Sequence, residues 1–222
     1  MGTSRQGIAV TLGDGLVDFE DRFGRRDFQR DTLVVCRSML GSILVHDSPA
    51  GRTAGRIVEI EAYLGPEDRA SHTYGGRKTE RNRAMHGEKG HAYVYFIYGM
   101  HWCCNIVCGP AGKPQAGLVR ALEPVAGLDL MRERIHSPHA KAESLCRGPG
   151  KLCKAMGITG ALYGADLTAE TLYLIPQAQR RGERILATPR IGIAYAGDFV
   201  DKPWRFLIEG NPSVSRPPRP PR

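Results

Sequence analysis

The sequence predicts one domain of mixed α+β fold. Several segments alternate apolar and polar residues with the period of two that strands show, and others carry apolar residues at helical spacing. The 222 residues are enough for one substantial core and short for two. We expect residues 1–26, which show no clear period, to be a loosely ordered lead-in, and residues 27–212 to be the domain. Residues 213–222 are rich in Pro and Arg, which predicts an extended, disordered tail.

The domain is expected to begin with a helix followed by a strand. Residues 31–40 place Leu33, Cys36 and Leu40 at helical spacing, and Gly41 is a stop signal. Residues 43–46 predict a strand that leads into a turn.

Residues 55–64 predict a strand with two different faces. Alternation places apolar side chains on one face, namely Val58, Ile60, Ala62 and Leu64. The opposite face carries Ile57, Glu59, Glu61 and Tyr63. Because two carboxylates and a phenol are costly to bury, we expect this second face to contact water or to form a site.

The remaining elements follow a long loop. Residues 65–90 are rich in Gly, Arg, His and Asn, and a loop of this length in a compact domain is usually functional. Further strands are predicted at 91–98, 102–108, 116–122, 190–195 and 204–208, and helices at 128–135 and 150–156. Gly99 predicts a turn that joins the first two of these strands into a hairpin.

Composition and charge narrow the class of protein. A hydrophobic fraction of 41% is ordinary for a globular protein, and no apolar run is long enough to span a membrane. Residues 1–7 lack the apolar stretch of a signal peptide, so we expect a cytoplasmic protein with its six cysteines reduced. The net charge of +8 favours nucleic acid as a partner, although many basic proteins do not bind it.

Two groups of residues are candidates for contacts with a nucleic acid, and each has a simpler interpretation. The loop at 75–83 concentrates donors that suit phosphates, namely Arg77, Lys78, Thr79, Arg81, Asn82 and Arg83. A solvated charged loop would have the same composition. Tyr98 lies beside Gly99 at the expected hairpin tip, where a ring can wedge into a base stack, while Tyr93 and Tyr95 share a strand face. Packing in the core is the commoner role of tyrosines in strands.

A third group could carry hydrolytic chemistry. A general base for hydrolysis is a carboxylate beside a water, and a nearby cation keeps it ionised. Glu61 with Tyr63, His72 and Arg120 would supply these groups, but spacing alone cannot show that they converge. The spacing of His86, His91 and His101 matches no standard metal site.

Several ordered stretches resemble the alkyladenine (3-methyladenine) DNA glycosylase family of purine DNA glycosylases. They are residues 56–68 (RIVEIEAYLGPED), 70–72 (ASH), 75–82 (GGRKTERN), 93–100 (YVYFIYGM), Asn105, 119–124 (VRALEP) and 148–153 (GPGKLC). The resemblance extends from about residue 27 to about residue 215. It implies a curved antiparallel sheet with helices around it and a β-hairpin that inserts into DNA.

The resemblance also implies a role for individual residues. The family's catalytic glutamate lies in a Glu-Ala-Tyr motif, which selects Glu61 over Glu59, and Arg120 matches the arginine that helps to hold the attacking water. Tyr63, His72 and Tyr95 match the pocket that stacks on an extruded base, and Asn105 matches the residue that disfavours guanine. Tyr98 matches the intercalating residue, and phosphate contacts are expected from Arg77, Thr79, Arg81 and Asn82.

The function implied is that of a monofunctional base-excision repair enzyme. It would flip alkylated or deaminated purines out of double-stranded DNA and hydrolyse the N-glycosidic bond, without lyase activity. The expected substrates are 3-methyladenine, 7-methylguanine, hypoxanthine and ethenoadenine. We expect a monomer without a metal or an organic cofactor, either bacterial, cytoplasmic and associated with the nucleoid, or nuclear if eukaryotic. Two alternatives stay open at this point: a non-catalytic binder of damaged DNA, and RNA modification, which only a fold resemblance to formyltransferases would suggest.

Overall fold

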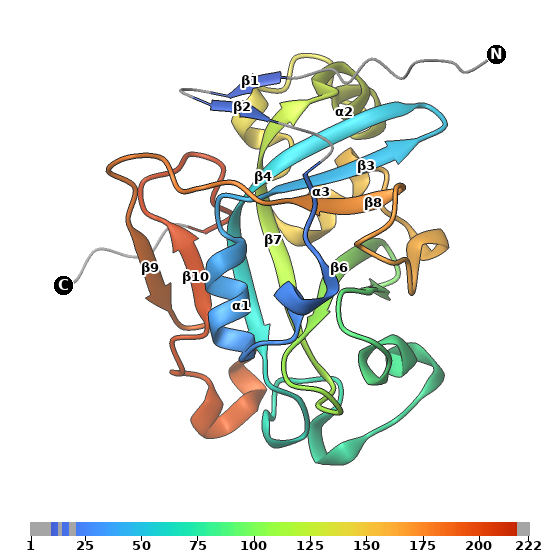
Figure 1. Cartoon of the computed structure of the whole chain (residues 1–222), viewed down its shortest axis with the longest axis vertical. Coiled ribbons are helices and arrows are strands. Elements are labelled where there is room, and N and C mark those ends of the chain that lie inside the picture. Colours follow the sequence, from blue (N-terminus) through green and yellow to red (C-terminus); the bar gives the residue numbers. More distant parts are fainter. Residues whose placement is uncertain (1–9, 13–14, 18–20, 217–222) are drawn as a thin grey trace.

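The computed structural model describes residues 10–12, 15–17 and 21–216 (Figure 1). Its strands are β1 Val10–Leu12, β2 Gly15–Val17, β3 Ile43–Ser48, β4 Gly51–Tyr63, β5 Ala92–Ile97, β6 His101–Cys108, β7 Gln115–Ala126, β8 Leu172–Ile175, β9 Ile185–Thr188 and β10 Arg205–Ile208. Its α-helices are α1 Thr32–Met39, α2 Leu128–Arg134 and α3 Pro149–Met156. The fold is therefore α+β, as the sequence predicts.

A curved antiparallel sheet forms the centre of the molecule (Figure 1). Its strands run in the order β5-β6-β7-β4-β10-β9, and β3 pairs with both β4 and β8. The long strand β4 therefore has β7 along one edge, and its other edge is shared by β3 and β10. Since β4 contains Glu59 and Glu61, these carboxylates lie in the middle of the sheet.

The two faces of the sheet differ in what covers them. On one face Ile60 and Gly117 lie against α1, where a Cβ at Gly117 would meet the Cys36 sulfur at 2.7 Å and Ile60 Cδ1 at 2.9 Å. Only glycine leaves room for this close approach of helix and sheet. Asp31 begins α1 by accepting hydrogen bonds from the backbone N–H groups of Leu33 and Val34. The opposite face carries the polar and aromatic side chains of the site described below.

The structure differs from the sequence prediction in one strand, in an additional strand and in the order of the long loop. The strand predicted at 190–195 is wrong: the strand is β9, and Ile193 is already the N-cap of a 3-10 helix, Ala194–Phe199. The sequence prediction also missed β8, which is buried between β3 and the lead-in. Residues 65–90 contain three 3-10 helices, Gly65–Glu67, Tyr74–Gly76 and Glu80–His86, so this loop is more ordered than expected.

The ends of the domain differ from the expected boundaries. The lead-in includes the short pair β1 and β2, and Phe23 packs in the main core. At the other end, Ser213 and Val214 are buried although the sequence assigned them to the tail. Residues 213–216 therefore pack with the domain, and residues 217–222 lie outside the described part of the chain.

Candidate active site

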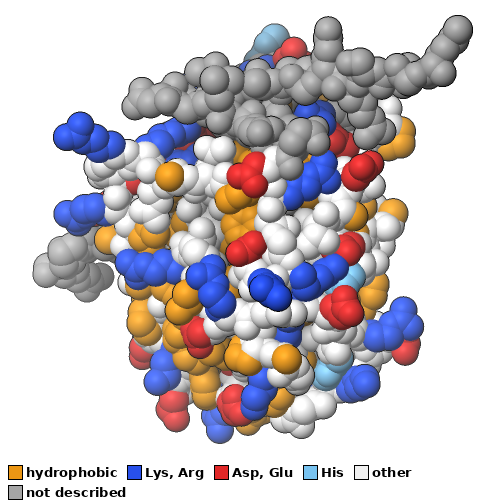
Figure 2. All heavy atoms as spheres, viewed as in Figure 1, with side chains coloured by type: hydrophobic (Ala, Val, Ile, Leu, Met, Phe, Trp, Pro, Cys, Tyr) orange, Lys and Arg blue, Asp and Glu red, His pale blue; other side chains and the backbone are white. Residues whose placement is uncertain are grey.

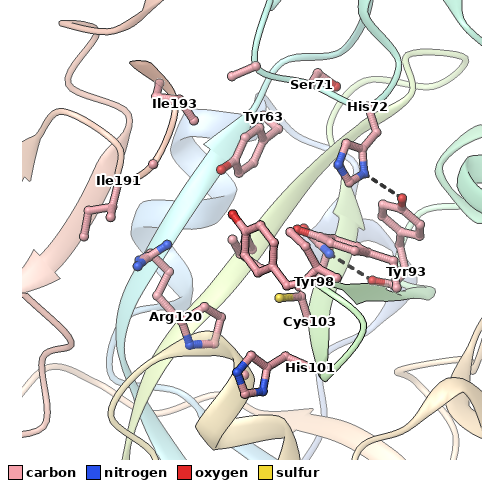
Figure 3. Close-up of a pocket in the computed structure, with 18 of the residues that line it drawn as sticks. Tyr63, Ser71, His72, Tyr93, Tyr98, His101, Cys103, Arg120, Ile191 and Ile193 are labelled. Carbon is pink, nitrogen blue, oxygen red and sulfur yellow. Dashed lines mark hydrogen bonds between the residues drawn. The ribbon is translucent and has the colours of Figure 1, made fainter. Parts of the chain in front are cut away.

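A pocket of about 480 Å³ opens on the polar face of the sheet (Figure 3). Its walls come from the end of β4, the loop at 70–72, Met85, the β5–β6 hairpin, the middle of β7, the start of α3, the segment at 191–195 and Arg216. In Figure 3 the side chains of Tyr63, His72, Tyr98 and Arg120 point into the space between these segments. The sequence-predicted base, aromatic residues and cation are thus brought together.

One row of paired residues across the sheet explains this convergence. Tyr93 of β5 pairs with Asn105 of β6, which pairs with Leu118 of β7. Leu118 pairs with Glu61 of β4, and Glu61 pairs with Arg205 of β10. Because residues paired across antiparallel strands project to the same face, the register gathers these side chains in one place.

Glu61 is fully buried and hydrogen-bonded by three residues of the pocket wall. Its Oε2 accepts from the Tyr63 hydroxyl at 3.0 Å and from Arg120 Nη1 at 3.2 Å. Its Oε1 accepts from the backbone N–H of Ile191 at 2.7 Å. The sequence leaves this strand face either in contact with water or part of a site. Glu61 follows the second alternative, because its buried carboxylate is satisfied by donors of the pocket wall.

Burial raises the pKa of Glu61 above its usual value, and the charge of Arg120 opposes that rise. A carboxyl group placed in this way suits proton transfer near neutral pH better than an exposed one. Arg120 is itself 7% exposed and donates through Nε to Glu59 at 3.0 Å. Glu59 is fully buried as well, so the guanidinium lies between two carboxylates.

Aromatic rings form the wall opposite Arg120. The His72 ring meets the Tyr95 ring edge to face, with centroids 4.7 Å apart, and Tyr95 lies 5.3 Å from Tyr93. His72 Nδ1 and the Tyr93 hydroxyl share a hydrogen bond of 2.7 Å. Burial, with help from the charges of Arg81 and Arg77, lowers the pKa of His72 to about 4, so the imidazole is neutral at physiological pH.

Asn105 is held in place at the pocket wall. It is 4% exposed, and its amide Nδ2 donates to the Tyr93 carbonyl at 3.0 Å. This bond fixes the orientation of the amide, so a ligand in the pocket meets a rigid side chain at this position.

Tyr98 projects from the tip of the β5–β6 hairpin. The turn is closed by the backbone bond from Met100 N–H to Ile97 O, and Tyr98 and Gly99 have φ values of 54° and 66°. These are the angles of a type I′ turn, in which the first central residue is seldom bulky. Tyr98 is also 81% exposed. A large ring held out into solvent on a strained turn indicates a contact with a partner.

Comparisons of the sequence with known proteins identify its family. The family model described as methylpurine-DNA glycosylase matches residues 26–212. The chain belongs to this family. It is 45% identical to a protein of Bacillus cereus strain ZK / E33L over 197 residues, which cover 85% of this chain and 96% of the relative. A Bacillus mycoides relative is 46% identical over the same length, covering 97% of that protein. Both relatives carry the name "Putative 3-methyladenine DNA glycosylase".

Members of the methylpurine-DNA glycosylase family are hydrolases of DNA repair, and DNA is their substrate. In the described part of the chain, no group of three or more His, Cys, Asp or Glu side chains could hold a metal ion. No helix among the described residues is long and apolar enough to cross a membrane.

The basic loop beside the pocket divides into exposed and buried residues. Arg77 and Arg81 are exposed, and Arg81 lies over the Tyr95 ring with its guanidinium carbon 5.2 Å from the centroid. Thr79 and Asn82 instead cap the 3-10 helix Glu80–His86 through a reciprocal pair of hydrogen bonds. Asn82 is 1% exposed and donates to the carbonyls of His72 and Arg77. The Asn82 side chain braces the loop from within, while Arg81 Nη2 donates to the Phe96 carbonyl of β5 at 3.1 Å.

Basic residues on the face shown in Figure 2 do not single out a binding surface. On the face shown in Figure 2, Lys and Arg side chains lie among Asp and Glu side chains and do not form one continuous patch. The interpretation of a DNA-binding side therefore depends on the pocket, on Tyr98 and on the loop at 77–82.

Sequence reasoning missed the residues that hold the pocket from behind. Arg190 forms a fully buried ion pair with Asp68 at 2.6 Å, and its guanidinium lies between the rings of Tyr63 and Trp204, at 4.7 and 5.0 Å. Asp68 lies in the stretch 56–68 that resembles the family, but the local sequence pattern does not show that Arg190 is its partner. Ile191 contributes only its backbone N–H, which no side-chain motif can reveal.

Proposed function

We propose that this protein excises damaged purines from double-stranded DNA by hydrolysing the N-glycosidic bond, with Glu61 as the general base. One observation carries the proposal: the Glu61 carboxylate is held by Tyr63, Arg120 and Ile191, all three of which line one aromatic pocket beside the exposed Tyr98. Family membership supports the reaction class, and the geometry supports the assignment of roles.

DNA binding would begin at the exposed cations and at the hairpin. The exposed Arg77 and Arg81 would contact phosphates. Thr79, whose backbone N–H is bonded to Asn82, would offer its hydroxyl, and Asn82 would act by bracing the loop. Because a base inside a duplex is inaccessible, the damaged nucleotide must rotate out of the helix. Tyr98 would fill the space that the base leaves, which offsets part of the cost of unstacking.

The extruded base would stack in the pocket. Tyr63, His72 and Tyr95 offer ring faces and edges, and the neutral His72 can accept or donate a hydrogen bond without repelling a cationic base. Asn105, fixed by the Tyr93 carbonyl, would crowd the exocyclic amine of normal guanine. The substrates we propose are 3-methyladenine, 7-methylguanine, hypoxanthine and ethenoadenine.

The chemical step follows from the state of the Glu61 carboxylate. Among the described residues, Oε1 accepts one hydrogen bond, so a lone pair of this oxygen can take a proton from water. The water oxygen bonds to C1′ as the bond from C1′ to the purine nitrogen breaks, and the carboxylate charge stabilises the oxocarbenium-like transition state. A purine alkylated at N3 or N7 leaves as a neutral base, while hypoxanthine must gain a proton on leaving.

Further features of the proposal concern products and partners. Hydrolysis by water would leave an abasic site without strand cleavage, because none of the described residues that line the pocket is a lysine whose amine could replace the activated water. We propose that the enzyme acts as a monomer, without a metal or an organic cofactor. Its relatives in Bacillus species support action on a bacterial chromosome, which lies in the cytoplasm.

The Glu61→Gln variant tests the proposal directly. Gln is isosteric but cannot take up the proton, so base release should fall by at least about 10²-fold while DNA affinity stays within about threefold. Released base would be measured under single-turnover conditions in EDTA, on duplexes carrying one hypoxanthine or ethenoadenine and on methylated DNA. Glu123→Gln, on β7 and outside the pocket lining, is the matched control and should retain full activity.

The alternative is a non-catalytic binder of damaged DNA with the same hairpin. Binding of damaged duplexes by the wild-type protein, with no release of any of the four bases, would establish that alternative. Near-normal release by the Glu61→Gln variant would instead remove Glu61 from the role of base and leave the enzyme class intact.

A further inference from the structure

Glu59 is a second buried carboxylate that the proposed reaction does not use. It is fully buried on β4, two residues before Glu61. Its Oε1 accepts from Arg120 Nε at 3.0 Å, from Arg205 Nη1 at 2.9 Å and from the Ser215 hydroxyl at 2.9 Å. Its Oε2 accepts from the Ser215 backbone N–H at 2.6 Å. Taking a carboxylate out of water is costly, and these hydrogen bonds from two arginines and from Ser215 offset that cost.

The C-terminal segment at 213–216 is part of this arrangement. It is fixed to the sheet by hydrogen bonds from Arg147 Nε to the Val214 carbonyl and from Arg205 Nη1 to the Arg216 carbonyl. Ser215 is thereby held over Glu59, and Arg216 reaches the lining of the pocket. The segment closes the side of the site away from the aromatic rings.

Arg120 connects this arrangement to the reaction. Its guanidinium is held at two points, by Nε on Glu59 and by Nη1 on Glu61 Oε2 at 3.2 Å. We propose that Glu59, fastened by Ser215, is a positioning residue that turns the Arg120 guanidinium so that a single N–H reaches Glu61. The inference rests on the proposed function, since it assigns Glu59 a role in the same chemical step.

The planar fork of a guanidinium explains why such a device is needed. Arginine pairs most strongly with a carboxylate through two parallel N–H groups. A guanidinium released from Glu59 would pair with both oxygens of Glu61, and Oε1 would then be less able to accept a proton from water. Engaging Nε on Glu59 prevents this pairing and keeps the cation close enough to stabilise the ionised base.

The charge of Glu59 also acts on Glu61. The like charge raises the pKa of Glu61, opposing the effect of Arg120. The other titratable or charged groups that act on or lie near Glu61 are Tyr63, Cys103, Tyr195 and Arg205. Removing the charge of Glu59 should therefore lower the pKa of Glu61, and the acid limb of the rate profile should move to lower pH.

The test compares variants of the full chain on 7-methylguanine in duplex DNA, whose cationic leaving group needs no general acid. Glu59→Gln should lower the single-turnover rate by about 10²-fold, because misplaced groups cost about that much. DNA affinity should stay within about threefold, and the acid limb should move down in pH. Glu59→Asp keeps the charge, so it should recover part of the rate and return the acid limb of the pH–rate profile to its wild-type position. Ser215→Ala, which removes one of the two Ser215 bonds, should lose about three- to tenfold.

Glu183→Gln is the matched control, since Glu183 pairs with Arg56, a buried arginine of the same strand outside the pocket lining. It should leave rate and profile unchanged. A folded Glu59→Gln variant with a wild-type rate or an unmoved acid limb would overturn the inference. If Glu59→Gln does not fold, Glu59→Asp and Ser215→Ala provide the test. Wild-type rates in both of these variants would overturn the inference. Absence of base release by the wild-type protein would instead contradict the proposed function itself.

Discussion

At the scale of single residues, the site depends on which side chains carry charge. Glu61 is an acid whose pKa burial raises, whereas His72 is a base whose pKa burial lowers to about 4. Both shifts follow from the same desolvation, which disfavours the charged form of either group. The pocket therefore combines a carboxyl group of raised pKa with an imidazole that is neutral at physiological pH, which are the states that the proposed reaction requires.

The neutral His72 leads to a prediction about pH. The unfolded chain binds a proton at His72 near pH 6.5 and the folded protein only near pH 4, so His72 lowers the free energy of unfolding as pH falls between these values. The His72→Gln variant should therefore lose up to about 2 kcal/mol less free energy of unfolding than the wild-type protein when the pH falls. This figure allows for the partial exposure of the ring. Urea unfolding at pH 7 and pH 4.5 would measure the difference between wild type and variant.

The ring can also be followed directly by NMR. His72 should show no titration of its ring signals above about pH 5. Titration of His72 near pH 6.5 would contradict the neutral state in the pocket.

At the scale of elements, the β5–β6 hairpin supplies both a part of the pocket wall and the exposed Tyr98 at its tip. Tyr95 lines the pocket from the strand, while the turn at Tyr98 and Gly99 holds an exposed ring beside the same pocket. Backbone strain at Tyr98 is retained where a less bulky residue would fit the turn better. In the proposed reaction the hairpin would therefore couple filling of the DNA duplex by Tyr98 to capture of the extruded base by Tyr95.

Truncation of the wedge should weaken base release. Tyr98→Ala loses a stacking contact of about 1–3 kcal/mol, so the single-turnover rate on hypoxanthine should fall by roughly five- to 100-fold. Tyr98→Phe keeps the ring and should stay within about threefold of wild type. Fluorescence of a 2-aminopurine next to the lesion would report extrusion, and equal extrusion by the Ala variant would exclude Tyr98 as the wedge.

The loop at 65–90 owes its order to hydrogen bonds to a buried amide. Asn82→Ala would leave the Thr79 N–H and the carbonyls of His72 and Arg77 without their partner. The free energy of unfolding should fall by about 1–3 kcal/mol, and proteolysis within 73–88 should become faster. Lys78→Ala, at an exposed position of the same loop, should change stability by less than about 0.5 kcal/mol. A stable, protease-resistant Asn82→Ala variant would contradict this account.

At the scale of the whole molecule, the pocket exists because distant segments are fastened together. Asp68 accepts from Leu64 N, from Ala70 N and from both terminal nitrogens of Arg190, which follows β9. This buried ion pair fixes the segment at 190–195, and with it the Ile191 N–H that holds Glu61. The base is thus positioned by an interaction that joins residues 122 positions apart.

Breaking that pair should affect stability and catalysis together. Asp68→Ala leaves Arg190 as an uncompensated buried charge, which costs about 3–5 kcal/mol in free energy of unfolding. The neighbouring Glu67→Ala variant removes only a weak contact of an exposed side chain and should cost less than about 1 kcal/mol. Urea denaturation measures both, and equal stability of the two variants would show that the pair is not important.

Some of this protein was determined by the sequence alone. The period of two places Glu61 and Tyr63 on one face of a strand, and Gly99 beside Tyr98 predicts the hairpin tip, because both signals depend only on neighbouring residues. Helix α1 was predictable for the same reason. The prediction of a strand at 190–195 was wrong because a short apolar run can occur in a strand or in a turn. The conformation of this segment depends on the buried ion pair of Arg190, which the local pattern does not show.

Only the tertiary structure decided which groups meet. The pairing register aligns Glu61 with Leu118 and Asn105, and a one-residue shift would send these side chains to the opposite face. Whether Glu59 and Glu61 face water or buried cations depends on Arg120 and Arg205, which lie far away in the chain. Alternation is a local property of the backbone, whereas burial and charge compensation depend on contacts that form only when the whole chain has folded.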